Sequence, residues 1–237
     1  MASERLVGVQ TLRRFITWSF VLALVAGLIF VSWQRDFLRA PIAAIDPTSE
    51  AAFEQWVAED DERRIAFQQF EGFLREEGVV GIVPTWQLTR IDRFYAGKCD
   101  LPVFRLPPRE LWPNIVPALR LVQTHVEPAV GEVSVHSSYR TPELNTCAGG
   151  ASRSRHLRFE ALDLRLENPR EDLRSLYRDL CAMHEAAGPG SRMGLGAYHD
   201  LDDDGYNRAG RFHIDAAGYR NWGRTYTSAS SPCGRFD

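Results

Sequence analysis

The chain has 237 residues, of which 44% are hydrophobic, and a formal net charge of −3. This length and apolar content suffice for one folded domain with a short appendage, and they exclude a disordered or fibrous chain. The slight negative charge provides no basic field for phosphate groups. We therefore expect no nucleic-acid partner.

The N-terminal part contains an uncharged run of nineteen residues, 15–33, with tryptophans near both ends. At about 1.5 Å per residue, a helix of this length spans a hydrocarbon core. A cleaved signal peptide, the alternative, would have a shorter apolar region followed by a small-residue cleavage site. Arg13 and Arg14 favour a cytoplasmic N-terminus. We expect a tail at 1–14, a transmembrane anchor at 15–33, a linker at 34–50 and a folded domain at 51–237.

The four cysteines all follow the expected anchor and are widely scattered. Zinc sites built from cysteine usually show closely spaced pairs, so two disulfides in an oxidising compartment are the better interpretation. Three pairings are open, and the sequence does not decide among them. Our working expectation is Cys99 with Cys147 and Cys181 with Cys233.

The folded part is expected to alternate helices with short strands. Thr48 or Ser49 marks a helix start, and the apolar spacing over 51–77 predicts one long amphipathic helix or two short ones. Further helices are predicted at 114–130 and 171–187, and a half-buried strand at 132–138. This order, which lacks regular βαβ units, predicts an α+β fold with a small antiparallel sheet flanked by helices.

His156 and Asp163 stand seven residues apart in "SRHLRFEALDLRL". On one helix they would lie about 10.5 Å apart along the axis, too far for two ligands with bonds of about 2 Å to one metal. On one straight strand an odd spacing sends the side chains to opposite faces. The remaining arrangement is a loop carrying His156 that folds back over a strand beginning near Ala161, with Asp163 opposite the leucine face.

A second predicted strand, "RFHIDAAG", places His213 and Asp215 on one face. If the two strands are neighbours, Asp163 and His213 are cross-strand partners about 5 Å apart. Together with His156 they supply two imidazoles and one carboxylate. This set binds a catalytic zinc ion and leaves a fourth position open for water.

Four segments in order carry a family resemblance: "SSYRTPELN", "GGASRSRHLRFEALDLRL", "GLGAYH" and "RFHIDAAGYRNWG". Over roughly residues 110–224 they resemble the D-alanyl-D-alanine carboxypeptidase, dipeptidase and endopeptidase family of zinc peptidases that act on bacterial peptidoglycan. The resemblance implies that His156, Asp163 and His213 bind zinc. It also implies that Ser154 and Arg140 contact substrate or the developing oxyanion, and it adds Tyr139 as a substrate-side candidate.

Two positions depart from the family pattern. Phe159 replaces a glycine of the zinc loop, which must then turn without glycine's conformational freedom. Gly210 occupies the position where many members carry an acidic general base. Three alternatives for the base stay open: Asp215, which could equally orient the His213 ring, the acidic loop that follows His199, or no base at all.

The acidic loop "DLDDDGYNRAGR" places Asp200, Asp202 and Asp204 in the spacing of a calcium loop. Its twelfth position is Arg211 instead of a bidentate glutamate, which favours a solvated acidic turn over a calcium site.

The leading hypothesis is therefore a zinc D,D-carboxypeptidase or D,D-endopeptidase anchored in the bacterial inner membrane, with its domain in the periplasm and peptidoglycan stem peptides as substrate. One alternative is a catalytically degenerate, zinc-containing wall-binding or scaffold protein, because a shared fold does not establish activity. A calcium-dependent interaction module is a third. The sequence does not indicate the oligomeric state.

Overall fold

The computed structural model describes residues 24–27, 30, 45–202 and 209–236. By their internal contacts the residues group into two units, Met1–Ile45 and Asp46–Asp237. The expected tail and most of the expected anchor and linker lie outside the described residues. Among the residues that are described, no helix is long and apolar enough to cross a membrane.

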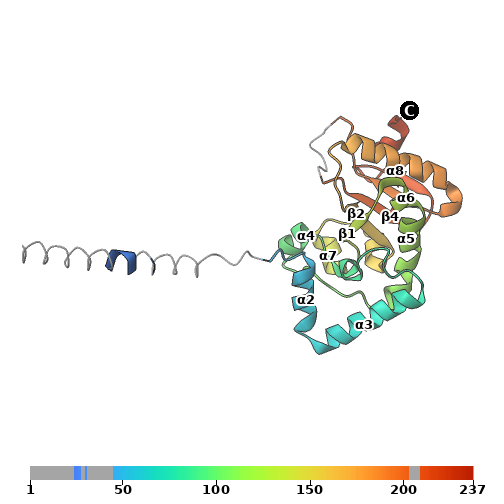
Figure 1. Ribbon diagram of the computed structural model, residues 1–237. Coiled ribbons are helices and arrows are strands. Elements are labelled where there is room, and N and C mark those ends of the chain that lie inside the picture. Colours follow the sequence, from blue (N-terminus) through green and yellow to red (C-terminus); the bar gives the residue numbers. More distant parts are fainter. Residues whose placement is uncertain (1–23, 28–29, 31–44, 203–208, 237) are drawn as a thin grey trace, which may run out of the picture. The chain divides into compact units, whose positions relative to one another are not determined.

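Asp46–Asp237 forms an α+β unit around a five-stranded sheet (Figure 1). Its α-helices are α2 (Glu50–Ala58), α3 (Asp61–Glu76), α4 (Arg93–Lys98), α5 (Val116–Leu121), α6 (Glu127–Val130), α7 (Pro142–Cys147) and α8 (Leu173–Ala187). Its strands are β1 (Val133–Ser137), β2 (Ala161–Leu166), β3 (Gly194–Ala197), β4 (Phe212–Asp215) and β5 (Arg220–Trp222).

The first predicted helix is two helices in the structure. Ser49 is the N-cap of α2, and its hydroxyl accepts a hydrogen bond from the backbone N–H of Ala52. Asp60 is the N-cap of α3 and accepts from the N–H of Arg63. Because an aspartate N-cap starts a new helix, the chain turns between Ala58 and Asp61 instead of continuing as one rod.

The second predicted helix is one helical segment with a wider central turn. It runs as α5, a π-helical turn at Val122–Val126, and α6. Pro117 and Pro128 each lie in the first turn of an α-helical part, where a missing N–H breaks no hydrogen bond. The third predicted helix is α8, which begins after its N-cap Asp172.

The sheet order is β1-β2-β4-β3-β5, and three of its four pairings are antiparallel. The expectation of a purely antiparallel sheet is wrong, because β5 pairs with β3 in parallel. The segment after β4 crosses the end of β3 through a turn in which Gly218 has φ +136° and donates to the carbonyl of Arg192. This crossover puts β5 on the far side of β3, running in the same direction.

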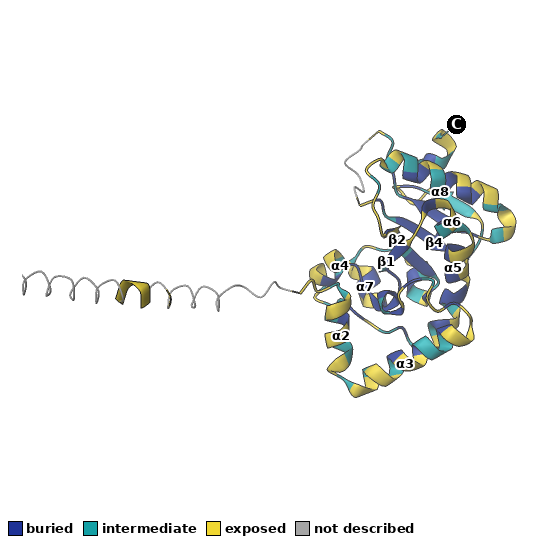
Figure 2. Cartoon of the chain, in the orientation of Figure 1, coloured by how far each residue is buried: buried dark blue, intermediate teal, exposed yellow. Residues whose placement is uncertain are grey.

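The two faces of the sheet are chemically different, as the alternation in β2 and β4 predicts. Leu162 pairs with Ile214 and Leu164 with Phe212, and all four side chains are fully buried in the main core. Figure 2 shows the central strands and the inward sides of α5 and α8 as buried. The opposite face carries Asp163 paired with His213.

Two disulfides brace the unit. Cys99 is bonded to Cys147, which joins the residue after α4 to the end of α7. Cys181 is bonded to Cys233, which joins α8 to the C-terminal segment. These are the two pairs taken as the expectation among the three that the sequence allows.

Candidate metal centre

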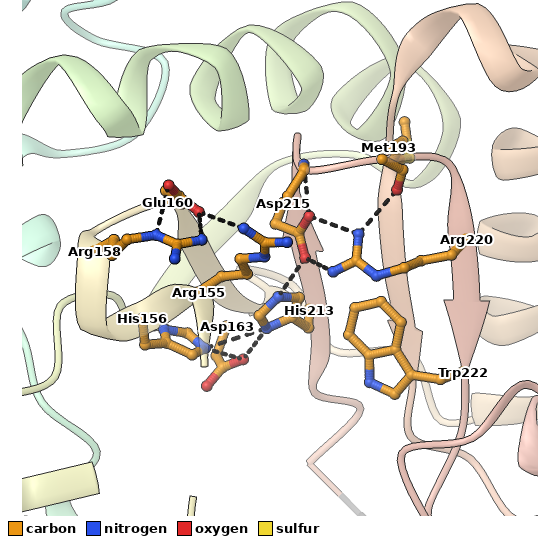
Figure 3. Close-up of polar contacts among 12 residues, drawn as sticks. Arg155, His156, Arg158, Glu160, Asp163, Met193, His213, Asp215, Arg220 and Trp222 are labelled. Carbon is orange, nitrogen blue, oxygen red and sulfur yellow. Dashed lines mark hydrogen bonds and ion pairs between the residues drawn. The ribbon is translucent and has the colours of Figure 1, made fainter. Parts of the chain in front are cut away.

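Three potential ligand atoms converge on the polar face of the sheet (Figure 3). The Nε2 atom of His156 lies 3.2 Å from Oδ1 of Asp163 and 3.2 Å from Nδ1 of His213. The Nδ1 atom of His213 lies 3.0 Å from the same carboxylate oxygen. The structure therefore brings together the three residues that the sequence selected.

Three different elements, two strands and a 3₁₀ turn, supply the three side chains. Asp163 and His213 are direct cross-strand partners on β2 and β4, so the sheet fixes their spacing. His156 comes from η4, a 3₁₀ turn at Arg155–Arg158 that precedes β2. The carbonyl of His156 accepts from the N–H of Arg140 at 3.0 Å, which ties this turn to the segment after β1.

Hydrogen bonds on the outer side of each imidazole fix where its proton lies. Nδ1 of His156 donates to the carbonyl oxygen of Ser138, so its Nε2 carries the lone pair. Nε2 of His213 donates to Oδ2 of Asp215 at 3.2 Å, so its Nδ1 carries the lone pair. Both lone pairs and the Asp163 oxygen therefore point at one another, an arrangement that a cation stabilises.

The dimensions of this triad fit zinc. Two ligands about 2.0–2.1 Å from one tetrahedral zinc ion are roughly 3.3 Å apart, close to the 3.0–3.2 Å between the three atoms. Imidazole nitrogen and carboxylate oxygen are both ordinary zinc ligands. Three protein ligands leave a coordination position for water, as catalytic zinc sites require.

The electrostatic environment holds His156 and Asp163 in their metal-binding forms and favours the protonated form of His213. Burial lowers the pKa of His156 and favours the neutral imidazole. Burial alone would raise the pKa of Asp163, but His156, His213 and Arg140 outweigh it and hold this pKa well below its ordinary value. For His213, burial opposes the charged form, yet the hydrogen bonds with Asp163 and Asp215 raise the pKa. Metal binding would therefore displace a proton from His213.

Asp215 is fully buried and both of its oxygens are engaged. Its Oδ1 accepts from Nη1 of Arg220 at 3.0 Å and from the N–H of Ala217 at 2.8 Å. Its Oδ2 accepts from Nη2 of Arg220 at 2.6 Å and from His213. Without exposed surface, this carboxylate is poorly placed to take a proton from water. The geometry favours the orienting role for Asp215 over that of a base.

Arg140 contacts the triad, Ser154 precedes the turn that carries His156, and Tyr139 is buried near other charges. Nη2 of Arg140 donates to Oδ2 of Asp163 at 2.6 Å, which leaves Oδ1 for the metal. Ser154 is the half-buried N-cap of η4. Tyr139 is buried, and the charges nearest its hydroxyl are those of Arg105, Glu143 and Glu110. We infer that Tyr139 packs instead of contacting substrate.

Phe159, the first departure from the family pattern, adopts a left-handed backbone conformation, which glycine adopts without strain. Its φ of 56° and ψ of 37° are left-handed, and its N–H bonds the carbonyl of His156. Its ring is fully buried, with its centroid 6.0 Å from that of Phe70 on α3 and 6.4 Å from that of Tyr139. The zinc loop therefore keeps its turn, and the ring anchors it to the N-terminal helices.

Asn114 provides a second link between the zinc loop and the segment before it. Its Nδ2 donates to the carbonyl of Arg158 at 2.9 Å. Together with the Phe159 ring, this bond connects η4 to residues that precede β1. The apolar spacing of the helices before residue 80 does not indicate what they contribute to the site, and the structure shows that α3 contacts the zinc loop through Phe70.

Gly210, the second departure, has a structural reason. Its φ is +61°, and a Cβ at this position would lie 3.0 Å from Cδ2 of Leu173 and 3.2 Å from Cδ2 of Leu176 on α8. A side chain would be strained and crowded, and helix α8 covers the place where it would extend. The backbone conformation and the two leucines therefore disfavour a base at this position.

The structure gives no support for the calcium site. The Asp200 carboxylate pairs with Arg224 at 3.1 Å, and Asp202 forms two hydrogen bonds of 3.0 Å with Arg235. These arginines neutralise the charge that a calcium ion would need. Asp204 lies outside the described residues.

Three contributors to the site were not identified from the sequence. The Ser138 carbonyl that orients His156 has no sequence signal, because any residue supplies a carbonyl. Arg220 and Trp222 belong to the motif "GYRNWG", but the sequence assigns them no role in the site. In the structure the ring centroid of Trp222 lies 5.2 Å from that of His213. Tyr198 accepts a hydrogen bond from Nε1 of Trp222.

Comparison with known proteins identifies one family. The family model described as Peptidase M15 matches residues 105–191, which include His156 and Asp163 and end before His213. No curated protein and no solved structure matches the chain significantly. The third ligand, His213, lies outside the matched segment. It joins the triad because β4 pairs with β2, which places His213 opposite Asp163. Residues 105–191 are thus similar to the M15 peptidases, a family of zinc peptidases of the D-Ala-D-Ala carboxypeptidase and endopeptidase type.

Proposed function

We propose that this chain is a membrane-anchored zinc metallopeptidase that hydrolyses a D,D or related peptide bond in peptidoglycan stem peptides. The observation that carries the proposal is the convergence of His156 Nε2, Asp163 Oδ1 and His213 Nδ1, with both imidazole protons directed outward. The family match supports the reaction class and the substrate class. The uncharged run 15–33 and the two disulfides support an inner-membrane anchor and a periplasmic domain.

In this proposal the side chains of the site position the metal and stabilise charge. When bound, zinc supplies Lewis acidity, which polarises the scissile carbonyl and lowers the pKa of a coordinated water. Arg140 holds Asp163 by one oxygen. Its positive charge beside the triad would stabilise negative charge that develops on a substrate carbonyl bound there. Asp215 and the Ser138 carbonyl hold the two imidazole rings.

Neither carboxylate of the site is placed to accept a proton from the attacking water. Asp163 offers one oxygen to the metal and the other to Arg140, while Asp215 is buried between His213 and Arg220. Asp163 therefore serves as a metal ligand, and Asp215 orients the His213 ring.

A catalytically degenerate, zinc-containing peptidoglycan-binding protein is the second candidate. The observation that favours it is Gly210, whose backbone conformation and contact with α8 leave no room for the acidic side chain that many family members carry there.

Hydrolysis of defined peptidoglycan fragments separates the two candidates. The purified chain, loaded with zinc, is incubated with a disaccharide pentapeptide and with a cross-linked dimer. Release of a terminal alanine indicates a carboxypeptidase, and splitting of the dimer an endopeptidase. His156→Ala should abolish either activity, whereas His125→Ala, a histidine outside the triad, should not. One bound zinc without turnover of either substrate would favour the degenerate protein.

Membrane anchoring has its own test. The full chain should sediment with inner membranes and resist alkaline extraction, whereas a variant that lacks residues 1–45 should be released. Release of the full chain by alkali would contradict the anchor.

A further inference from the structure

A row of aromatic rings leads from the candidate metal centre to an exposed tyrosine. The ring centroids of His213 and Trp222 are 5.2 Å apart, and Figure 3 shows Trp222 beside His213. Nε1 of Trp222 donates to the hydroxyl oxygen of Tyr198 at 3.4 Å. The Tyr198 ring in turn lies 6.0 Å from the ring of Tyr226, which is 76% exposed.

Gly196 brings this row onto the same face of the sheet as the triad. It is the cross-strand partner of His213, and a Cβ there would lie 2.9 Å from both Cβ of His213 and the hydroxyl oxygen of Tyr198. The Tyr198 side chain therefore occupies the space that a residue at 196 would fill, next to His213. The metal centre and Tyr226 are therefore connected by side chains that contact one another in sequence.

The turn that presents Tyr226 is firmly braced. Tyr226 has a left-handed φ of 59°, and its N–H bonds the carbonyl of Gly223 at 3.1 Å. A Cβ at Gly223 would lie 1.8 Å from the Ser230 carbonyl oxygen, so two backbone segments touch here. The nearby Cys233 is bonded to Cys181 on α8. An exposed ring held in this way loses little conformational entropy on binding, and strained backbone of this kind is concentrated at functional sites.

The described residues around Tyr226 are polar, and their charges are paired. Arg224 pairs with Asp200 at 3.1 Å, and Arg235 pairs with Asp202 at 3.0 Å. Hydroxyl-bearing residues of the turn include Thr225, Thr227 and Ser230. A flat ring with neighbouring hydroxyls suits the apolar C–H face and the hydroxyl groups of a sugar better than a charged peptide group.

We propose that Tyr226 forms a subsite that stacks on an amino-sugar ring of the glycan strand, while the stem peptide extends past Tyr198 and Trp222 to the metal centre. This inference rests on the proposed function, since it names the part of the same substrate that the rim contacts. An extended peptide spans at most about 3.5 Å per residue, so a stem of up to about five residues covers roughly 17 Å. The row of rings has steps of comparable size. The ring centroids of His213 and Trp222 are 5.2 Å apart, Trp222 Nε1 lies 3.4 Å from the Tyr198 hydroxyl, and the Tyr198 and Tyr226 ring centroids are 6.0 Å apart.

Binding measurements with two probes test the subsite. Affinities for a disaccharide pentapeptide and for the free pentapeptide are measured by calorimetry in the His156→Ala chain, which prevents turnover. We expect the sugar-bearing probe to bind about fivefold to tenfold more tightly, the range expected for one aromatic stacking contact. Tyr226→Ala should remove this preference and Tyr226→Phe should retain it. Phe94→Ala, which removes an aromatic ring that is 70% exposed on α4, should leave it intact.

The outcomes distinguish the subsite from the proposed function. Absence of a preference for the sugar-bearing probe, or a preference that survives Tyr226→Ala in a chain with unchanged thermal unfolding, would overturn the subsite. If the unmutated chain hydrolyses the free pentapeptide, the proposed function stands in either case. A preference that depends on Tyr226, in a chain that hydrolyses neither probe and does not split the cross-linked dimer, would support the subsite and contradict the peptidase.

Discussion

Replacing Phe159 with alanine and with glycine tests how the zinc loop is held. Both variants lose a fully buried ring that contacts Phe70 and Tyr139. Loss of such a ring costs about 3–5 kcal/mol of unfolding free energy. Only alanine retains the left-handed strain, which costs a non-glycine residue about 1–2 kcal/mol. Glycine also has the greater entropy in the unfolded state, which offsets part of this relief of strain. The glycine variant should therefore be more stable than the alanine variant by roughly 1 kcal/mol.

Unfolding of the zinc-free chain by denaturant measures directly which of the two variants has the larger free energy of unfolding. For a unit of this size, 1 kcal/mol corresponds to about 2–4 °C in melting temperature, which is resolvable. Phe159→Leu is the matched control, because it keeps an apolar side chain and should cost less than either truncation. An alanine variant as stable as the glycine variant, or truncations that cost less than 1 kcal/mol, would refute the reasoning.

Three further predictions concern other positions. Gly210→Asp should destabilise the chain by about 1–2 kcal/mol and should not raise the rate of hydrolysis, because its side chain would meet α8; a faster enzyme would contradict this. Asp215→Asn should weaken zinc binding about 10–100-fold in a chelator competition, as expected for a residue that orients a ligand, and unchanged affinity would exclude that role. Asp92 is buried, which opposes its charge, but His136 and Arg211 lower its pKa from 3.8 to about 2. Its stabilisation should therefore be complete above pH 4 and lost as the pH falls towards 2, so Asp92→Asn should reduce the acid-dependent loss of stability by about 2 kcal/mol; equal pH profiles would refute this.

The pairing at the centre of the site was predictable because strand alternation is strict. Leucines at every second position of β2 set the core face, and the same rule in β4 placed Asp163 and His213 on the other face. The odd spacing of His156 then required a loop. These steps use only local geometry, which the sequence encodes directly.

The remaining features depend on contacts between distant segments. The parallel pairing of β5 with β3 follows from how the chain crosses the sheet end, which no periodicity reveals. A left-handed phenylalanine is rare, so Phe159 was expected to disturb the loop, and only the pocket beside Phe70 shows how its ring is accommodated. From the sequence, Gly210 indicates only that the acidic base is missing. Its left-handed backbone and the nearby leucines of α8, which explain the glycine, depend on the folded structure.

The metal content of the purified chain tests the central claim most directly. After incubation with zinc and removal of excess metal, elemental analysis should find one zinc per chain. His156→Ala, Asp163→Ala and His213→Ala should each lose it, while His125→Ala should retain it. A wild-type chain without zinc, or triad variants that bind it as tightly as wild type, would contradict the assignment of this site.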